Sequence, residues 1–325
     1  MTAPLIIAIP SKGRLKEQVD AWLGDCGLGL RSVGGARGYR ARLDGFDEVE
    51  VRLASAGDIA ASLVSGEIHL GVTGEDLLRE AEEALDAKVM LLRALSFGRA
   101  DLVVAAPKSW IDVETMADVD DVAHLYLART GRRLRVATKY LSQTRAFFAR
   151  HGIADYRLVE SGGATEGAPA AGAAEIIVDI TTSGATLAAN GLKVLADGVI
   201  LRSQAHLAAS LLAPWDAERM ETCRRLLGIV EARARGAAIA SLVWPTAQDA
   251  AARAAVAAFA APDEAARSNG ALVVQSDLFA ATQALAAAGV GPVSVTHPTY
   301  VFEAVSESAG RLAAALGPWR QNGKG

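Results

Sequence analysis

The sequence predicts an α/β fold with a smaller α+β module at its C-terminal end. Short apolar runs alternate with segments of helical periodicity through the first two-thirds of the 325 residues, which is typical of parallel sheets with helices on both faces. At about 150 residues per domain, this length corresponds to two or three domains. Because 51% of the residues are hydrophobic and 22% are charged, the chain can bury a full core and does not belong to the disordered class.

The expected strands of the first two-thirds are short apolar runs bounded by turn residues. They are Leu5–Ile9, Val49–Ala54, Ile68–Val72, Val89–Leu92, Leu102–Ala106, Leu134–Ala137, Tyr156–Val159 and Glu175–Ile180. Helices are expected between them, at Gly13–Gly24, Asp58–Val64, Glu75–Ala87, Leu141–Arg150 and Ala164–Ala171. Asp58 is expected to cap the second of these helices, which Ser65 and Gly66 end. The stretch Val194–Leu212 fits two strands that return to the first sheet.

The tail begins after a break at Ala213–Asp216. Its expected elements are a cationic helix at Glu218–Arg235, strands at Ala237–Trp244, Ala271–Val274 and Val293–Thr296, and helices at Gln248–Ala260 and Leu278–Ala288. This pattern predicts a compact α+β module whose sheet leaves an edge or a face for a second subunit.

Charge and cysteine content exclude several classes of protein. With 33 Lys and Arg against 37 Asp and Glu, the net charge is −4, without the basic excess that nucleic-acid-binding proteins usually show. Cys26 and Cys223 lie far apart, which excludes a disulfide framework and a cysteine-rich zinc site; both are expected to be buried, inert thiols. We find no targeting segment and no run of about 18 apolar residues. A soluble, cytoplasmic protein without membrane contact is therefore expected.

The most informative segment is Glu175–Leu187, in which an apolar strand runs into hydroxyl residues and a glycine before a helix begins. Backbone N–H groups, hydroxyls and the start of a helix then converge on one point, which suits an anion such as phosphate. Gly184 lets the backbone approach the ligand closely. Asp179 stands at the carboxyl end of the strand, where its two oxygens can accept hydrogen bonds from vicinal ribose hydroxyls. An ordinary helix cap would account for any one of these residues, but not for the whole pattern.

The segment Pro10–Leu15 repeats this arrangement after the first strand, with one glycine and two cations. Lys12 and Arg14 stand at a helix N-terminus, where positive charge is unfavourable to the helix dipole. An anionic ligand at this position would explain them. The alternative is two solvated surface cations.

Two further loops hold acidic residues. Glu166 lies in the glycine-rich loop Ser161–Pro169, where it could bind a hydroxyl group or a magnesium-bound water. Glu75 and Asp76 follow Gly74 at the start of a helix, and could simply favour that start. The five histidines are scattered singly, with neither metal-ligand spacing nor a nucleophile–base arrangement.

Five segments together resemble the ATP phosphoribosyltransferase family, whose members catalyse the first step of histidine biosynthesis. They are collinear over residues 5–215 and read PSKGRL from Pro10, GVTGEDLL from Gly71, VATKYLSQTRAFFARHGI from Val136, GGATEGAP from Gly162 and IIVDITTSGATLAANGLK from Ile176. The last is specific to phosphoribosyl-diphosphate binding, and the first together with ANGL is specific to this family. The tail is similar to the C-terminal regulatory domain of the family's long form.

The resemblance implies transfer of a phosphoribosyl group from phosphoribosyl diphosphate to N1 of the adenine of ATP. It implies dependence on Mg²⁺, which the substrate would carry without a direct side-chain ligand. It also implies a two-lobed core like that of periplasmic binding proteins, with residues 1–98 and 189–215 in the first lobe and 99–188 in the second. Residues 217–325 would form an ACT-like, ferredoxin-like domain. Feedback inhibition by L-histidine and a homo-oligomer, dimeric or hexameric, are further implications.

Site residues carry over from the family where this sequence matches its motifs. The resemblance implies catalytic roles for Asp179, Glu166 and Lys12. The residues that it implies in substrate binding are Ser11, Gly13, Arg14, Gly74, Glu75, Asp76, Thr181, Thr182, Ser183, Gly184, Ala185 and Thr186. The sequence departs from the family at Ala164, where the family usually has a serine.

Other functions remain open on the sequence alone. A phosphoribosyltransferase that acts on a free base has a similar loop, but such loops usually carry two adjacent acids, and here Val178 precedes Asp179. A non-catalytic two-lobed binding protein should have an export signal and would not need a phosphoribosyl loop. A catalytically inactive regulatory relative conflicts with the retained acids and cations of the candidate site.

Overall fold

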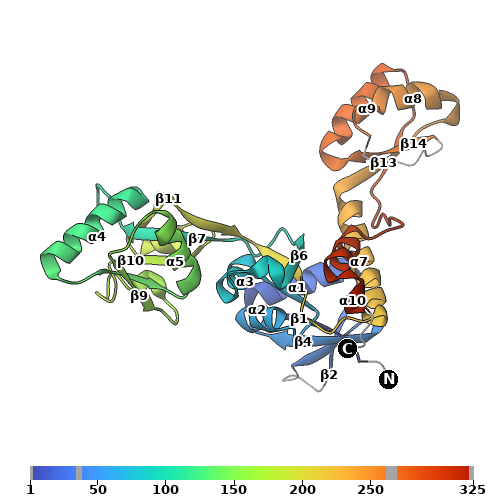
Figure 1. Cartoon of the computed structure of the whole chain (residues 1–325). Helices are drawn as coiled ribbons and strands as arrows, with labels where there is room; N and C mark the ends of the chain where they lie inside the picture. The colour runs from blue at the N-terminus through green and yellow to red at the C-terminus, as the bar shows by residue number, and fades with distance from the viewer. Residues whose placement is uncertain (1–2, 34–38, 261–268, 322–325) are drawn as a thin grey trace. The chain divides into compact units, whose positions relative to one another are not determined.

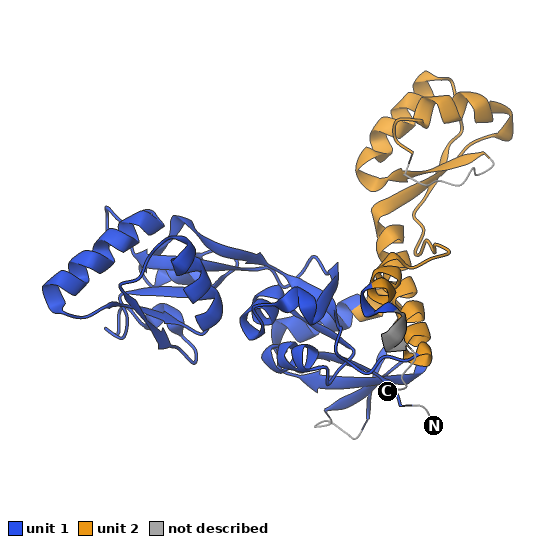
Figure 2. Cartoon of the chain, in the orientation of Figure 1, with its two compact units in different colours: residues 1–22, 29–216, 315–325 blue, residues 23–28, 217–314 orange. Residues whose placement is uncertain are grey.

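The computed structural model describes residues 3–33, 39–260 and 269–321 (Figure 1). The chain divides into two compact units (Figure 2). Unit 1 comprises residues 1–22, 29–216 and 315–325, and unit 2 comprises residues 23–28 and 217–314. No helix of the described residues is long and apolar enough to cross a membrane.

The first sheet of unit 1 has seven strands. They are β1 (Leu5–Pro10), β2 (Leu30–Val33), β3 (Arg40–Leu43), β4 (Phe46–Ala54), β5 (Leu70–Gly74), β6 (Val89–Ala94) and β12 (Ala205–Ser210), accompanied by α1 (Gly13–Asp25), α2 (Ala56–Ser65) and α3 (Glu75–Ala81). The strand order is β2-β3-β4-β1-β5-β12-β6. β1 is parallel to β4 and β5, whereas β12 is antiparallel to β5 and β6. Ile59 and Leu63 of α2 are fully buried against this sheet.

The second sheet of unit 1 has five strands. They are β7 (Ala100–Pro107), β8 (Leu134–Thr138), β9 (Tyr156–Glu160), β10 (Ile176–Thr181) and β11 (Leu192–Ser203), accompanied by α4 (Met116–Thr130), α5 (Leu141–Arg150) and α6 (Ala185–Ala189). The strand order is β11-β7-β10-β8-β9. β8 is parallel to β9 and β10, and β7 is antiparallel to β10 and β11. Met116 and Phe148 are buried in the core beneath it.

The chain passes between the two sheets twice. Residues 95–99 link β6 to β7, and Gln204 alone separates β11 from β12. The crossings are hydrogen bonded to each other, because Leu95 N donates to Ala205 O at 2.9 Å and Ala205 N donates to Phe97 O at 3.0 Å. The two sheets therefore form two lobes joined by a double crossing.

Three helical expectations need correction. α2 is capped by Ser55, whose Oγ accepts from Asp58 N at 3.1 Å, so Asp58 lies in the first turn. α3 ends at Ala81 and does not reach Ala87. Glu82 and Glu83 follow Ala81. Their negative charges are unfavourable at the C-terminus of a helix, where the dipole is negative, and this favours termination at Ala81. The expected helix Ala164–Ala171 is only a 3₁₀ turn, Thr165–Gly167, because Gly167 and Pro169 disfavour a longer helix.

The strand expectations need two corrections. Both sheets are mixed, although the alternation of strands and helices predicts parallel sheets. Of the two strands within Val194–Leu212, only β12 returns to the first sheet. β11 pairs with β7 in the second sheet, with a register shift between Val194 and Val199 that accommodates Asp197 and Gly198. β11 thus belongs to the second lobe, although a boundary at residue 189 would place it in the first.

Unit 2 contains a long helix and a small sheet. Its elements are α7 (Ala217–Ala238), β13 (Ile239–Val243), α8 (Asp249–Val256), β14 (Gly270–Val274), α9 (Leu278–Ala287) and β15 (Ser294–Thr296), and α10 (Glu307–Gln321) starts within it. The sheet order is β14-β13-β15, all antiparallel. Trp244, Val256 and Leu285 are buried between the sheet and α8 and α9. The segment that joins Ala260 to Ala271 falls largely on residues 261–268, outside the described residues.

Both cysteines are buried, as expected. Burial raises the pKa of the Cys223 thiol to about 12. This thiol is therefore uncharged at neutral pH and unreactive as a nucleophile.

Candidate active site

The loop after β10 forms a tight turn around Gly184, whose φ of 73° lies in the region that favours glycine. Gly184 N donates to Thr181 Oγ1 at 2.8 Å, and Thr182 Oγ1 donates to the carbonyl of Arg99 at 3.1 Å. A β-carbon on Gly184 would meet no atom within 4 Å. α6, which begins at Ala185, has five residues, so its dipole is small and anion binding depends on the loop hydroxyls and amides.

A cavity of about 250 Å³ adjoins this loop and is lined by Asp179 and Glu166 together with residues 181–183 and 185–186. Asp179 Oδ1 accepts from Ile180 N at 2.8 Å. Burial raises the pKa of the Asp179 carboxyl above its ordinary value, Lys139 opposes this rise, and the negative charge of Glu166 adds to it. A ligand that brings hydroxyl groups or positive charge would therefore stabilise the ionised form of Asp179.

Glu166 reaches this cavity from a different element of the second lobe. It lies in the 3₁₀ turn that follows Ala164, whose φ of 50° is unusual for a residue with a side chain. Beneath it, the buried Thr165 donates to Ser161 Oγ at 3.0 Å. This hydroxyl pair holds the glycine-rich loop in the conformation that presents Glu166 to the cavity.

A second cavity, of about 470 Å³, is lined by both lobes of unit 1. Arg14, Gly74 and Asp76 line it from the first lobe, and Thr182 lines it from the second. Thr182 is one of three residues that line both this cavity and the smaller one. The two cavities therefore adjoin at the loop after β10, and the structure joins the N-terminal cation Arg14 to the candidate phosphate loop.

Five of the expected site residues line neither cavity, and one of them is Gly184, the turn glycine of the loop that borders the smaller cavity. Ser11, Lys12 and Gly13 lie outside both, although Gly13 begins α1 with a φ of 77°. Glu75 also lies outside both, and its Oε1 accepts from Arg79 Nε at 2.7 Å. The roles implied for these five residues stay predictions.

Two cations of the site were not among the expected residues. Lys139 immediately follows β8, the strand that pairs with β10, and its charge opposes the rise in the pKa of Asp179. Arg99, in the first crossing, lines the larger cavity. The sequence feature that could have predicted Lys139 is a cation directly after a buried strand. For Arg99 it is a cation after Phe97 and Gly98.

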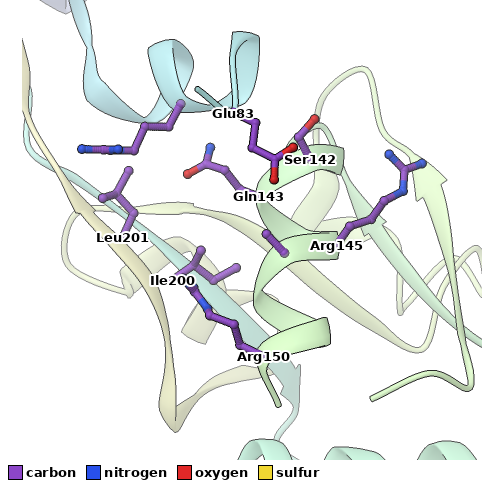
Figure 3. Close-up of a pocket in the computed structure, with 9 residues that line it drawn as sticks. Glu83, Ser142, Gln143, Arg145, Arg150, Ile200 and Leu201 are labelled. Carbon is purple, nitrogen blue, oxygen red and sulfur yellow. The ribbon is translucent and has the colours of Figure 1, made fainter. Parts of the chain in front are cut away.

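The largest of the three cavities lies elsewhere, with a volume of about 690 Å³ between α3, α5 and β11 (Figure 3). Arg145 and Arg150 line it together with the apolar Ile200 and Leu201. In Figure 3 the side chains of Arg145 and Arg150 extend in different directions and do not converge on one point. This cavity contains none of the expected site residues, so volume alone does not identify the candidate site.

Comparison with known proteins points to one family. The family model described as HisG, ATP phosphoribosyltransferase, matches residues 55–228. An ATP phosphoribosyltransferase of Caulobacter vibrioides (strain NA1000 / CB15N) is 67% identical over 316 residues, which cover 97% of this chain and 99% of that protein. An ATP phosphoribosyltransferase of Afipia carboxidovorans is 59% identical over 237 residues, 73% of each chain.

A solved structure supports the same assignment. The ATP phosphoribosyl transferase (HisG:HisZ) complex from Thermotoga maritima matches with a TM-score of 0.54 at 25% identity, covering 70% of this chain and 95% of that chain. The high identity to the Caulobacter protein extends over both units, so the similarity is not confined to one shared domain. The chain belongs to the HisG family of ATP phosphoribosyltransferases.

Proposed function

We propose that this chain transfers the phosphoribosyl group of phosphoribosyl diphosphate to N1 of the adenine of ATP. The products are phosphoribosyl-ATP and diphosphate, and the reaction is the first step of L-histidine biosynthesis. The observation that carries the proposal is the pair of adjoining cavities, one lined by two carboxylates and the hydroxyl loop, the other by Arg14 and Arg99. The first suits a ribose phosphate and the second suits an anionic nucleotide.

In this mechanism the loop Thr181–Thr186 holds the 5′-phosphate through its hydroxyls and amides. Asp179 accepts hydrogen bonds from the ribose hydroxyls, and its negative charge stabilises the positive charge that develops on C1. The bond between C1 and the diphosphate oxygen breaks, and its electron pair leaves with diphosphate. N1 of adenine has a lone pair at neutral pH, so the new C1–N1 bond forms without a general base. Catalysis then rests on positioning and electrostatics.

Cations of the site complement the phosphates of both substrates. Arg14 and Arg99 line the larger cavity, where the triphosphate of ATP would lie. Lys139 acts electrostatically on Asp179, and its charge would favour the diphosphate that leaves a ribose held by this acid. Lys12, which precedes α1, is exposed and free to approach a bound polyphosphate. These groups would hold the two polyanions together against their mutual repulsion.

Magnesium is part of the proposal. The acids present fit a cation, because Asp179 and Glu166 line one cavity and the charge of Glu166 raises the pKa of Asp179. When bound to the phosphate oxygens of the substrate, magnesium would neutralise charge on the leaving diphosphate. Glu166 would hold that ion through a bound water, and Asp179 would remain on the ribose hydroxyls.

We assign self-association, as a dimer or a hexamer, and histidine sensing to residues 217–325. Unit 2 supports this assignment because it has a core of its own, built around Trp244, Val256 and Leu285. The two lobes already hold both cavities of the candidate site, so the added module requires another use. Histidine bound there would inhibit by favouring one assembly or one arrangement of the lobes.

The test of the reaction is direct. Purified protein is incubated with ATP, phosphoribosyl diphosphate and magnesium, and the ultraviolet absorbance of phosphoribosyl-ATP is followed. Product should form only when all three are present. A folded protein that forms no product from ATP, but consumes phosphoribosyl diphosphate with adenine or another free base, would instead show the alternative activity on a free base.

A further inference from the structure

A buried carboxylate joins the two lobes of unit 1. Asp76, in the first turn of α3, is 5% exposed, and Tyr140 and Ser203 are 0% and 3% exposed. Tyr140 Oη donates to Asp76 Oδ2 at 2.6 Å, and Ser203 Oγ donates to Asp76 Oδ1 at 2.8 Å. Ser203 Oγ also accepts from Asp76 N at 3.0 Å. These three side chains, called here the Asp76 node, give both carboxylate oxygens a hydroxyl donor.

The node lies where the chain passes between the sheets. Asp76 follows β5 of the first sheet, Tyr140 follows β8 of the second, and Ser203 ends β11 just before the second crossing. Burial and then the charge of Asp76 raise the pKa of the Tyr140 hydroxyl, which therefore stays protonated as a donor at any ordinary pH. One carboxylate thus holds elements of both lobes together.

Further hydrogen bonds extend this junction along α3. Ser142 N and Gln143 N, at the start of α5, donate to the two oxygens of Glu80 at 2.9 and 3.1 Å. Gln143 Nε2 donates to the carbonyl of Asp76 at 2.8 Å. Figure 3 shows Ser142 and Gln143 beside Glu83, on the side of α5 that faces α3. The junction therefore combines these directional bonds with an apolar contact, because Leu77 of α3 packs against the cores of both lobes.

The Asp76 node adjoins the candidate site at two of its residues, Asp76 and Tyr140. Asp76 lines the cavity of about 470 Å³. A β-carbon on Gly74 would lie 2.2 Å from Asp76 Oδ1, so the node requires glycine there although a φ of −74° is open to any residue. At Tyr140, the Nζ of the neighbouring Lys139 lies 4.9 Å from the centre of the ring. The positive charge of Lys139 also opposes the rise in the pKa of Asp179.

We infer that Tyr140 is a positioning residue for the proposed reaction. By holding Asp76, it sets the spacing between the first-lobe wall of the larger cavity and the loop after β10. It also fixes the backbone from which Lys139 extends. The inference rests on the proposed function, and Tyr140 itself touches no reacting atom. Because reacting groups must be held within about 0.5 Å of their productive geometry, loosening this junction lowers turnover more than it lowers substrate binding.

The test compares Tyr140→Phe with Tyr126→Phe. Tyr126 Oη donates to Glu175 at 2.9 Å in the same lobe, and Tyr126 lines neither cavity of the site. Each variant thus loses one hydroxyl–carboxylate bond, and both should lower the Tm. Tyr140→Phe should lower kcat by about 10²-fold with KM values within about threefold of wild type. Tyr126→Phe should keep kcat within about twofold.

Ser203→Ala removes the other hydroxyl of the node and provides a second variant should Tyr140→Phe not fold. It should show the same selective loss of kcat. With wild type active, a folded Tyr140→Phe or Ser203→Ala with normal kcat overturns the inference while the proposed function stands. An equal loss of kcat in Tyr126→Phe overturns it as well, because the effect would then be one of general stability. An inactive wild type overturns the proposed function itself, and the inference with it.

Discussion

Gly184 combines a left-handed backbone, with φ of 73°, and open space where a side chain would project. We expect Gly184→Val to raise the KM for phosphoribosyl diphosphate by about tenfold or more, because the new side chain would occupy the approach of the phosphate. Gly131→Val is the matched control: Gly131 also has positive φ, 67°, and open space, but lies at the end of α4. Both variants should lose similar stability in thermal unfolding. An unchanged KM for Gly184→Val would show that the phosphate does not lie there.

Asp179 illustrates how a partly buried acid can favour function over stability. Because burial raises its pKa, the folded protein binds more protons than the unfolded chain between the unfolded and folded pKa values, and stability falls as pH rises through that window. At neutral pH, Asp179→Asn should therefore raise the Tm of the substrate-free protein. The same variant should lower kcat by about 10²-fold, the cost of one preorganised electrostatic contact. A loss in both Tm and kcat would indicate a structural role instead.

The ionisation of Asp179 should also determine how the reaction rate falls at acidic pH. The acid limb of kcat/KM for wild type should lie above the ordinary aspartate value of 3.8, because burial raises the pKa of Asp179. Activity is lost as pH falls through this raised pKa. The limb should be absent from the residual activity of Asp179→Asn, measured over the same pH range.

Among the elements, those with a continuous apolar run were predictable from the sequence. The bounds of α5 are as expected, β1 is one residue longer at its end, and β10 is shifted by one residue. β2 and β3 were missed because neither contains an apolar run: β2 is largely exposed, and β3 alternates exposed arginines with buried Ala41 and Leu43. α4 was missed too, although Thr115 and Asp118 form a capping box that the sequence displays.

The sequence prediction and the structure differ in which residue caps the N-terminus of α2. Ser55 accepts from Asp58 N, whereas the sequence pattern favours Asp58 as the cap. We expect Ser55→Ala to lower the free energy of unfolding by about 1 kcal/mol, because an amide of the first turn loses its partner. Asp58→Asn keeps the Ser55 acceptor and should cost less. A loss for Asp58→Asn in chemical denaturation as large as that for Ser55→Ala would contradict this ranking.

For the molecule as a whole, the candidate site was predictable in parts but not as an assembly. Asp179 and the hydroxyl loop are contiguous in sequence and have a local signature. The closeness of Lys139 to Asp179, and of Tyr140 to Asp76, depends on strand order and on the double crossing. Sequence periodicity does not encode which strands become neighbours, so these pairs emerge only from the folded structure.

Two half-exposed valines lie on one face of the sheet of unit 2. Val243 and Val274, 42% and 39% exposed, project from the face of the sheet opposite the core formed with α8 and α9. Truncation after Asp216 would not isolate this surface, because residues 315–325 belong to unit 1 and would also be removed. A pair of substitutions on the face itself is the cleaner experiment.

We expect Val243→Glu combined with Val274→Glu to reduce the size of the assembly in analytical ultracentrifugation, because two buried carboxylates would oppose association. If histidine acts through the assembly, its inhibition should weaken in parallel, while kcat without histidine stays within about twofold of wild type. Phe279→Glu is the control, since Phe279 on α9 is 82% exposed and the substitution adds a carboxylate elsewhere on unit 2. An unchanged assembly in the double variant would place self-association on another surface. A wild-type enzyme that ignores histidine would leave unit 2 with assembly as its only role.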